Sequence, residues 1–345
     1  MKHRTFFIAW VIGLVALGAA SAWATLRPAL LDRSQASLGY EQVRSISGQS
    51  KLGTIPVQVG ISIEKISDFS VKNVAWNADF LVWFKWRQPP ASPSFDPGQA
   101  FEIVTGTIVS KQKIIDQVQG PDHYSLYRVS ATINYPFNVA RYPMDDHLLS
   151  MFLQDPIHPQ IQYIADRVNS RVDPAIRIPG YQIAQTVIGV QTVPEDTTFG
   201  IPSGQKEFEQ FGFGIFILRQ GFGFFLKLFQ ALFVAVGVAL LAGFFKAHEE
   251  IRVELLVGGL FAAVANTYIT SSYLPDTGTM TLMDQVNLLG LGVIFICLIQ
   301  TVISSRFAAR DELDFCQLFD RTSFALIAFF YISLNVILPL AARMH

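Results

Sequence analysis

The apolar residues of this chain gather in long runs, and four of these runs follow one another in its C-terminal part. They occupy residues 222–245, 253–274, 286–303 and 322–342. Because a helix needs roughly 20 residues to cross the hydrocarbon core of a bilayer, each run predicts one transmembrane helix. Residues 220–345 are therefore predicted to form a four-helix transmembrane bundle.

A further apolar run opens the chain. Lys2 and Arg4 precede it, and small residues follow it at Ala22 and Ala24. A basic start, a short apolar core and an A-x-A site are typical of a secretory signal peptide, which predicts residues 1–24 as a signal peptide cleaved after Ala24. The alternative is an uncleaved signal anchor. Both interpretations place the following segment outside the cytoplasm.

Charged residues in the links between the runs predict the same orientation. If residues 25–218 lie outside, the links 246–252 and 304–321 lie in the cytoplasm, and they carry Lys246, Arg252, Arg306, Arg310 and Arg321. The outer link 275–285 has no Lys or Arg. Cytoplasmic links of membrane proteins are enriched in these two residues, so the charges agree with the orientation that the signal peptide predicts. The predicted location is the plasma (inner) membrane, which the chain crosses several times.

Residues 51–219 show a different pattern, in which apolar side chains alternate with polar or small ones. The alternation is clear in 57–63, 80–86, 127–133 and 211–217. Short alternating segments separated by Pro, Gly and Asp are typical of a β-sandwich. The predicted fold is thus a β + α membrane protein, with a leader at 25–50 and an extracellular or periplasmic β-sandwich before the helices. Long loops are predicted at 88–97 and 192–206.

Composition and charge exclude several classes of function. Apolar residues make up 51% of the chain and the net charge is −1, which argues against a basic nucleic-acid binder. Cys297 lies within the third run and Cys316 in the second cytoplasmic link, so the exported domain has no disulfide and both cysteines are interpreted as structural. That domain shows no Ser-His-Asp order, metal-ligand spacing or paired carboxylates. We therefore expect no enzyme activity, no cofactor and no metal site.

Five motifs stand at the junctions between the predicted elements. An aromatic-Pro-apolar-Asp core at 142–145 lies between two strands, and Arg219 directly precedes the first membrane run. The link 272–284 contains Leu-Pro and Thr-x-x-Asp, 320–323 opens the last run, and Trp86 ends the second strand. In this order and spacing, the motifs resemble those of the pentameric ligand-gated ion channels, the Cys-loop receptor superfamily.

The resemblance covers about residues 50–343 and is to the prokaryotic branch, which lacks the disulfide. Tyr135 and Leu149 stand where the animal receptors have cysteines. Two features depart from the family. Ala231 replaces the usual proline of the first membrane helix, and 154–158 has no ligand-box aromatic residue. The resemblance implies a homopentamer whose second membrane helix lines a pore.

The resemblance also implies a ligand site between subunits. Leu81 and Trp83 match one side of this site, while His158 and Phe199 match the other side. Ordinary strand packing and loop variation are the alternative for these four residues. For His158, a plain surface role or a pH-responsive role is open as well.

Four further residues are implied to couple the exported domain to the pore. Asp145 and Arg219 would form an ion pair at the junction, and Pro275 and Asp276 would receive the motion. A rearranging pair of charges suits a bistable switch. The alternatives are a static interface salt bridge and, for Asp145 with its neighbours at 146–147, a metal site.

The second membrane run carries the argument for the pore, independently of the resemblance. At about 100° per helical residue, seven residues fall within one narrow arc: Glu250, Glu254, Gly258, Phe261, Ala265, Tyr268 and Ser272. A carboxylate at a membrane helix end is costly when it faces lipid and tolerated when it faces water. Asn266 and Thr267 lie off the arc and are predicted to form hydrogen bonds between helices.

Each group on this arc has a predicted role. Rings of Glu250 and Glu254 attract cations and reject anions, and a ring of Phe261 forms a hydrophobic gate. Tyr268 is a second constriction, whereas Gly258, Ala265 and Ser272 leave the pore wider. The alternatives are that Glu250 only stabilises the helix start and that Phe261 packs between helices.

These observations predict a homopentameric channel that selects monovalent cations and is gated by a small extracellular ligand or by protons. The alternative is a non-conducting membrane receptor or sensor with the same fold. A membrane-anchored enzyme is the third class, and the exported domain offers no residues for it.

Overall fold

The computed structural model describes residues 2–31, 55–87, 95–158, 161–194, 207–276, 278–310 and 312–343. The chain divides into two compact units. The β unit comprises Ser34–Asn138 and Asp146–Gln220, and the helical unit comprises Met1–Arg33, Val139–Asp145 and Gly221–His345. The predicted leader at 25–50 lies mostly outside the described residues, since only its part up to Leu31 is described, as helix.

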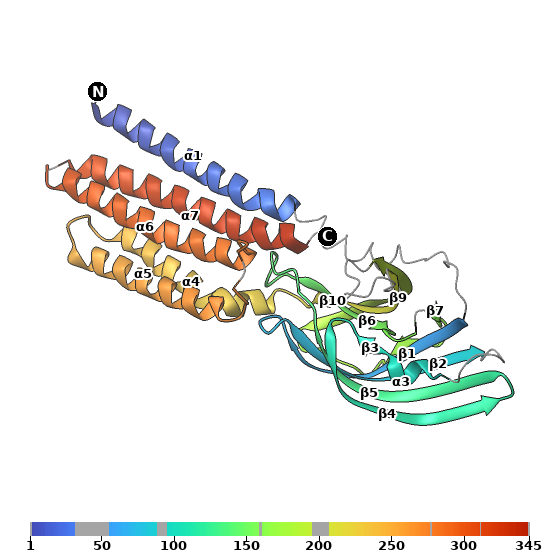
Figure 1. Ribbon diagram of the computed structural model, residues 1–345. Helices are drawn as coiled ribbons and strands as arrows, with labels where there is room; N and C mark the ends of the chain where they lie inside the picture. The colour runs from blue at the N-terminus through green and yellow to red at the C-terminus, as the bar shows by residue number, and fades with distance from the viewer. Residues whose placement is uncertain are drawn as a thin grey trace, which may run out of the picture. The chain divides into compact units, whose positions relative to one another are not determined.

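The β unit consists of two sheets (Figure 1). The larger sheet has the strand order β4-β5-β2-β1-β7, with β8 also paired to β1; the smaller has the order β3-β6-β10-β9. The strands of the larger sheet are β1 (Ile55–Ser70), β2 (Ala75–Arg87), β4 (Gly106–Gln119), β5 (Asp122–Asn134), β7 (Ile161–Ala165) and β8 (Arg171–Val172). Those of the smaller sheet are β3 (Glu102–Ile103), β6 (Asp146–Gln154), β9 (Tyr181–Pro194) and β10 (Glu207–Arg219).

The core of the β unit lies between the two sheets. The alternating apolar residues of β1, β2, β5 and β10 are almost completely buried in one cluster that draws on both sheets. Val57, Val59 and Ile61, for example, have no exposed surface. The four predicted alternating segments and the sandwich interpretation are therefore confirmed. A short helix, α3 (Pro97–Ala100), begins at the last residue of the predicted loop 88–97, of which 88–94 lie outside the described residues. Asp96 caps this helix by accepting a hydrogen bond from the Gly98 N–H at 2.8 Å.

Among its described residues, the helical unit has five helices that are long and apolar enough to cross a membrane. They are α1 (Lys2–Leu31), α4 (Gly223–Leu241, continued by the 3₁₀ turn Ala242–Phe244), α5 (Glu250–Ser271), α6 (Leu282–Ala308) and α7 (Leu313–Arg343). The sequence predicted four helices and a signal peptide. The fifth helix, α1, runs through the predicted cleavage site at Ala24 and lies along α7 (Figure 1).

The last two helices are longer than the apolar runs that predicted them. The predicted cytoplasmic link 304–321 is mostly helical, because α6 continues to Ala308 and α7 begins at Leu313. Cys316 accordingly lies buried within α7, not in a link. Hydropathy marks the length of chain that suits lipid, whereas a helix continues through polar residues as long as its backbone hydrogen bonds are satisfied.

The loop Val139–Asp145, which carries the predicted signature core, belongs to the helical unit and caps the start of α6. The N–H of Leu282 donates to the carbonyl of Ala140 at 2.7 Å, and the N–H of Met283 donates to the carbonyl of Tyr142 at 3.1 Å. The N–H of Asp284 donates to the Thr281 hydroxyl in a capping box. These bonds satisfy the N–H groups that a helix start leaves without partners, so the loop is fixed to α6.

Candidate functional site

Helix α5 has two sharply different faces. Its buried stripe consists of Arg252, Leu256, Gly259, Ala263, Asn266 and Thr270, spaced by three or four residues as one face of a helix requires. All seven residues of the predicted arc lie on the exposed side. The side chains of Phe261 and Tyr268 are 72% and 81% exposed. Within the chain, Phe261 therefore does not pack between helices, which was the alternative interpretation.

The acidic residues of this face are equally accessible. Glu250 and Glu254 are exposed in the first two turns of α5, and neither forms an ion pair or a side-chain hydrogen bond with another described residue. Glu249 is the N-cap residue, and its side chain makes no capping hydrogen bond. Glu250 lies in the first turn, where a negative charge favours the helix dipole, so this alternative for Glu250 stays open.

The opposite face of α5 is held by a buried ion pair that the sequence analysis missed. Arg252 donates to both carboxylate oxygens of Asp320 on α7, at 2.8 and 3.0 Å, and to the Thr301 hydroxyl of α6 at 3.1 Å. The Ser304 hydroxyl and the Gln300 amide also donate to Asp320, at 2.8 and 3.2 Å. A bidentate pair with satisfied neighbours is a strong, directional contact, and this one joins α5, α6 and α7.

This pair corrects one interpretation of the charge pattern. Arg252 was counted as a cation of a cytoplasmic link, but it lies in the first turn of α5 and has no exposed surface. No local pattern reveals its partner, because Asp320 is 68 residues further along the chain. The only indication in the sequence was that a charged residue near the end of a membrane helix usually has a partner of opposite charge.

A second polar contact joins α5 to α6. Asn266 donates to Asn287 at 3.1 Å, and Asn287 donates to the Thr270 hydroxyl at 2.7 Å. The predicted interhelical hydrogen bond of Asn266 is thus confirmed. The prediction for Thr267 was wrong, because its hydroxyl donates to the Ala263 carbonyl of its own helix at 3.0 Å. Together with Arg252, these contacts fix the rotation of α5 about its axis.

Two neighbouring glycines of α5 differ in the space around them. A Cβ at Gly259 would lie 3.0 Å from the Ala235 carbonyl oxygen of α4, whereas a Cβ at Gly258 would meet no atom within 4 Å. We expect Gly259→Leu to lower the free energy of unfolding by about 1–3 kcal/mol, the usual cost of overpacking. The same change at Gly258 should leave stability nearly unchanged. Thermal unfolding of the two purified variants checks this, and equal losses of stability would show that Gly258 is packed as well.

The predicted coupling residues lie in both units. Asp145 is buried in the loop Val139–Asp145 of the helical unit, while Pro275 is half-buried and Asp276 exposed in the link after α5. Arg219 ends β10 in the β unit. The ion pair of Asp145 with Arg219 would join residues of different units and stays a prediction.

Arg219 is itself held by an aromatic cluster, which the sequence did not indicate. Its guanidinium lies 4.3 Å from the ring centroid of Tyr181 and donates to the Tyr181 hydroxyl. Tyr181, Phe69, Phe137 and His147 pack with ring centroids 5.0–5.9 Å apart. A cation over an aromatic face is favourable, so this cluster orients Arg219 at the end of β10.

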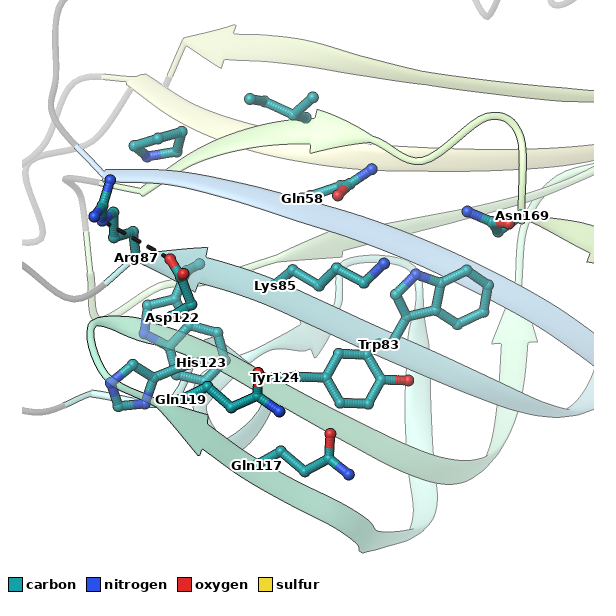
Figure 2. Close-up of a pocket in the computed structure, with 13 residues that line it drawn as sticks. Gln58, Trp83, Lys85, Arg87, Gln117, Gln119, Asp122, His123, Tyr124 and Asn169 are labelled. Carbon is teal, nitrogen blue, oxygen red and sulfur yellow. Dashed lines mark ion pairs between the residues drawn. The ribbon is translucent and has the colours of Figure 1, made fainter.

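A hollow of about 920 Å³ lies on the larger sheet of the β unit. Figure 2 shows side chains from several elements gathered around it, among them Gln58 of β1, Trp83 and Lys85 of β2, and Tyr124 of β5. The Lys85 ammonium lies 6.0 Å from the Tyr124 ring centroid. Trp83 was a predicted ligand residue and lines this hollow, whereas Lys85 and Tyr124 were missed because they look like ordinary exposed strand residues.

Trp83 is held in place by an acidic residue. Its indole N–H donates to Asp166 at 3.2 Å, and the Asn169 amide donates to both oxygens of the same carboxylate at 2.9 Å. Burial raises the pKa of Asp166, but the hydrogen bonds from Asn169 and Trp83 outweigh it and hold this pKa below its usual value. The carboxylate is therefore ionised near neutral pH and holds the side chains of Trp83 and Asn169, both of which line the hollow.

The other predicted ligand residues lie apart from this hollow. Leu81 is on the same face of β2 as Trp83 but is not among the residues that line it. His158 follows β6, where its ring nitrogen lies 2.9 Å from Asp155 and its ring packs on Phe95. It is thus half-buried rather than a plain surface residue. Phe199 lies outside the described residues.

Comparison with known proteins adds no family assignment: no family model and no curated protein matches this chain. Among the described residues, no group of three or more His, Cys, Asp or Glu side chains is placed to hold a metal ion. The geometry of α5 and of the β unit is therefore the basis for assigning a function.

Proposed function

We propose that this protein is a homopentameric, cation-selective ion channel of the plasma (inner) membrane, with the exposed face of α5 lining the pore. A small extracellular ligand or protons would gate it, and monovalent cations would pass through it. The observation that carries the proposal is the combination of two exposed carboxylates with two exposed aromatic rings on one face of a helix that is long and apolar enough to span a membrane.

The carboxylates support an aqueous environment for this face. A carboxylate facing hydrocarbon is strongly disfavoured, and such residues in membrane helices usually face a water-filled cavity or a partner. Glu250 and Glu254 have no partner among the described residues. Five copies of α5 around a common axis would bring ten carboxylates to one mouth of a pore, where they raise the local cation concentration.

The aromatic residues support a gate on the same face. Phe261 follows Glu254 by seven residues, which is about 10 Å along a helix at a rise of 1.5 Å per residue. Five phenylalanine rings at one level would form a constriction that excludes water and thereby ions. Gly258 and Ala265 flank this level with small side chains, so Phe261 would be the narrow point between them.

The β unit would supply the ligand-responsive part. Its hollow is lined by aromatic, amide and charged side chains, a mixture that suits a small polar molecule. The loop Val139–Asp145 is hydrogen-bonded to the start of α6, and β6 continues directly from it. A movement of β6 would thus be passed to the loop through the backbone and from the loop to α6 through these hydrogen bonds.

The alternative is a non-conducting receptor or sensor. Two aromatic positions on the same face, Phe261 and Tyr268, favour it, since two rings of side chains would form two barriers to ions. A recording of current separates the two proposals.

We expect the double change Glu250→Gln and Glu254→Gln to reduce the preference for K⁺ over Cl⁻ strongly. Removing the carboxylates abolishes the local excess of cations that gives a charged ring its selectivity. The measurement is the reversal potential in a KCl gradient across a planar bilayer, which should move toward zero in the variant.

The matched control is Glu249→Gln, because Glu249 is the adjacent acid and lies off the predicted arc. This variant should keep the reversal potential of the unmodified protein. If the double variant kept it too, the carboxylates of α5 would not act as the selectivity filter.

A further inference from the structure

Helix α1 packs on the rest of the helical unit along a continuous stripe. The spacing of three or four residues along this stripe defines one helix face, and the buried or half-buried positions are Phe7, Trp10, Val11, Leu14, Gly18, Ser21 and Ala22. The other side of α1 exposes apolar residues such as Ile8 and Ile12. A signal peptide needs only a short apolar core for export. Export therefore does not require a face of α1 that packs on other helices.

The contacts of the stripe are specific. The Trp10 indole N–H donates to the Ser323 hydroxyl of α7 at 3.0 Å, and the Trp10 ring lies 5.6 Å from that of Phe319. Phe6 packs on Phe307 of α6, with ring centroids 5.5 Å apart. A hydrogen bond and ring contacts between helices are typical of permanent association in a membrane.

The closest approach occurs at Gly18. A Cβ at this position would lie 2.7 Å from the ring of Phe330 on α7, so only glycine fits here without a shift of that ring. At Gly13, on the exposed side of the same helix, a Cβ would meet no atom within 4 Å. Small residues that let two helices approach closely are enriched at contacts between membrane helices.

We propose that α1 is retained in the mature protein as a fifth membrane-spanning helix, docked on α7 and α6. Its partner surface is formed by Phe307, Phe315, Phe319, Ser323 and Phe330. The retained helix keeps Lys2 and Arg4 in the cytoplasm, in agreement with the positive-inside rule. This inference decides between a cleaved signal peptide and an anchor, and it does not rest on the channel proposal.

The first test is the N-terminus of the full-length protein purified from membranes. Intact mass and N-terminal sequencing should show a chain that contains α1 from its first residues, close to 38.4 kDa. A chain that begins at Thr25 would overturn the proposal.

The second test measures docking itself. A protease site inserted between α1 and β1 allows α1 to be cut from the purified protein, which is then captured by a C-terminal tag. We expect the α1 fragment to remain bound in the unmodified protein and in Gly13→Leu, but to be lost in Gly18→Leu. The Gly13 variant is matched in helix and in substitution, and differs only in the face that carries it.

Two outcomes of this second test would overturn the proposal. One is release of α1 from the unmodified protein, which would mean that only the covalent chain held it. The other is equal retention in Gly18→Leu and Gly13→Leu, which would mean that the stripe centred on Gly18 is not the contact.

Discussion

Replacing Phe261 by alanine is expected to open the protein to ions without any ligand. The variant removes the five largest side chains from the proposed constriction, so that water can fill it and ions can follow. A shift of the closed–open equilibrium by about 1.4 kcal/mol changes the open fraction about tenfold, and we expect at least this increase in resting conductance. The measurement is the current through a planar bilayer that contains the purified variant.

The control for this prediction is Phe295→Ala. Phe295 is an exposed phenylalanine of α6, at 58% exposure, and it does not belong to the arc of α5. This variant should show the same resting conductance as the unmodified protein. A silent Phe261→Ala protein that is folded and inserted would favour the non-conducting receptor.

Of the proposed variants, Asp320→Ala is expected to lower the free energy of unfolding the most. It leaves the guanidinium of Arg252 buried without its carboxylate, and breaking one partner of a buried ion pair costs about 3–5 kcal/mol. The Ser304 hydroxyl and the Gln300 amide lose their acceptor as well. Thermal unfolding of the purified variant measures the effect, and a lower yield of folded protein from membranes should accompany it.

Two further variants distinguish the loss of the ion pair from a destabilisation that any substitution in α7 would cause. Arg321→Ala changes the exposed neighbouring residue and should leave the unfolding temperature nearly unchanged. The double variant Arg252→Met with Asp320→Leu replaces both charges by apolar groups and should recover much of the loss. If the double variant were as unstable as Asp320→Ala, the missing partner of Arg252 would not be the cause.

The sequence predicted those strands in which apolar residues alternate with polar or small ones. β1, β2, β5 and β10 alternate in this way, and all four were found. In β10 both faces are largely buried, and the alternation comes from Gly212 and Gly214 between the large apolar residues. β4 was missed because it lies at the edge of its sheet, where most side chains are exposed and the apolar ones, such as Ile114 and Ile115, do not alternate with polar residues. β6 was expected only from the resemblance, which places the 142–145 core between two strands. Its own pattern did not reveal it, because residues of both its faces are buried and an apolar run without alternation does not indicate a strand.

For α5, the sequence predicted the two faces of the helix but not its neighbours. Helical geometry places Glu254, Phe261 and Tyr268 together, and all three are exposed. The partners of the opposite face were not predictable, because Arg252 meets Asp320 only once α5, α6 and α7 are packed. Periodicity gives the orientation of side chains around one axis, whereas contacts between helices depend on the tertiary arrangement.

The most direct test of the central claim is the reversal potential of the Phe261→Ala protein in a planar bilayer with a tenfold KCl gradient. We expect a reversal close to the potassium potential, about 59 mV from zero for a monovalent ion, and a shift toward zero when Glu250 and Glu254 are both changed to glutamine. A reversal close to the chloride potential, or the absence of current, would contradict the proposal that the exposed face of α5 lines a cation-selective pore.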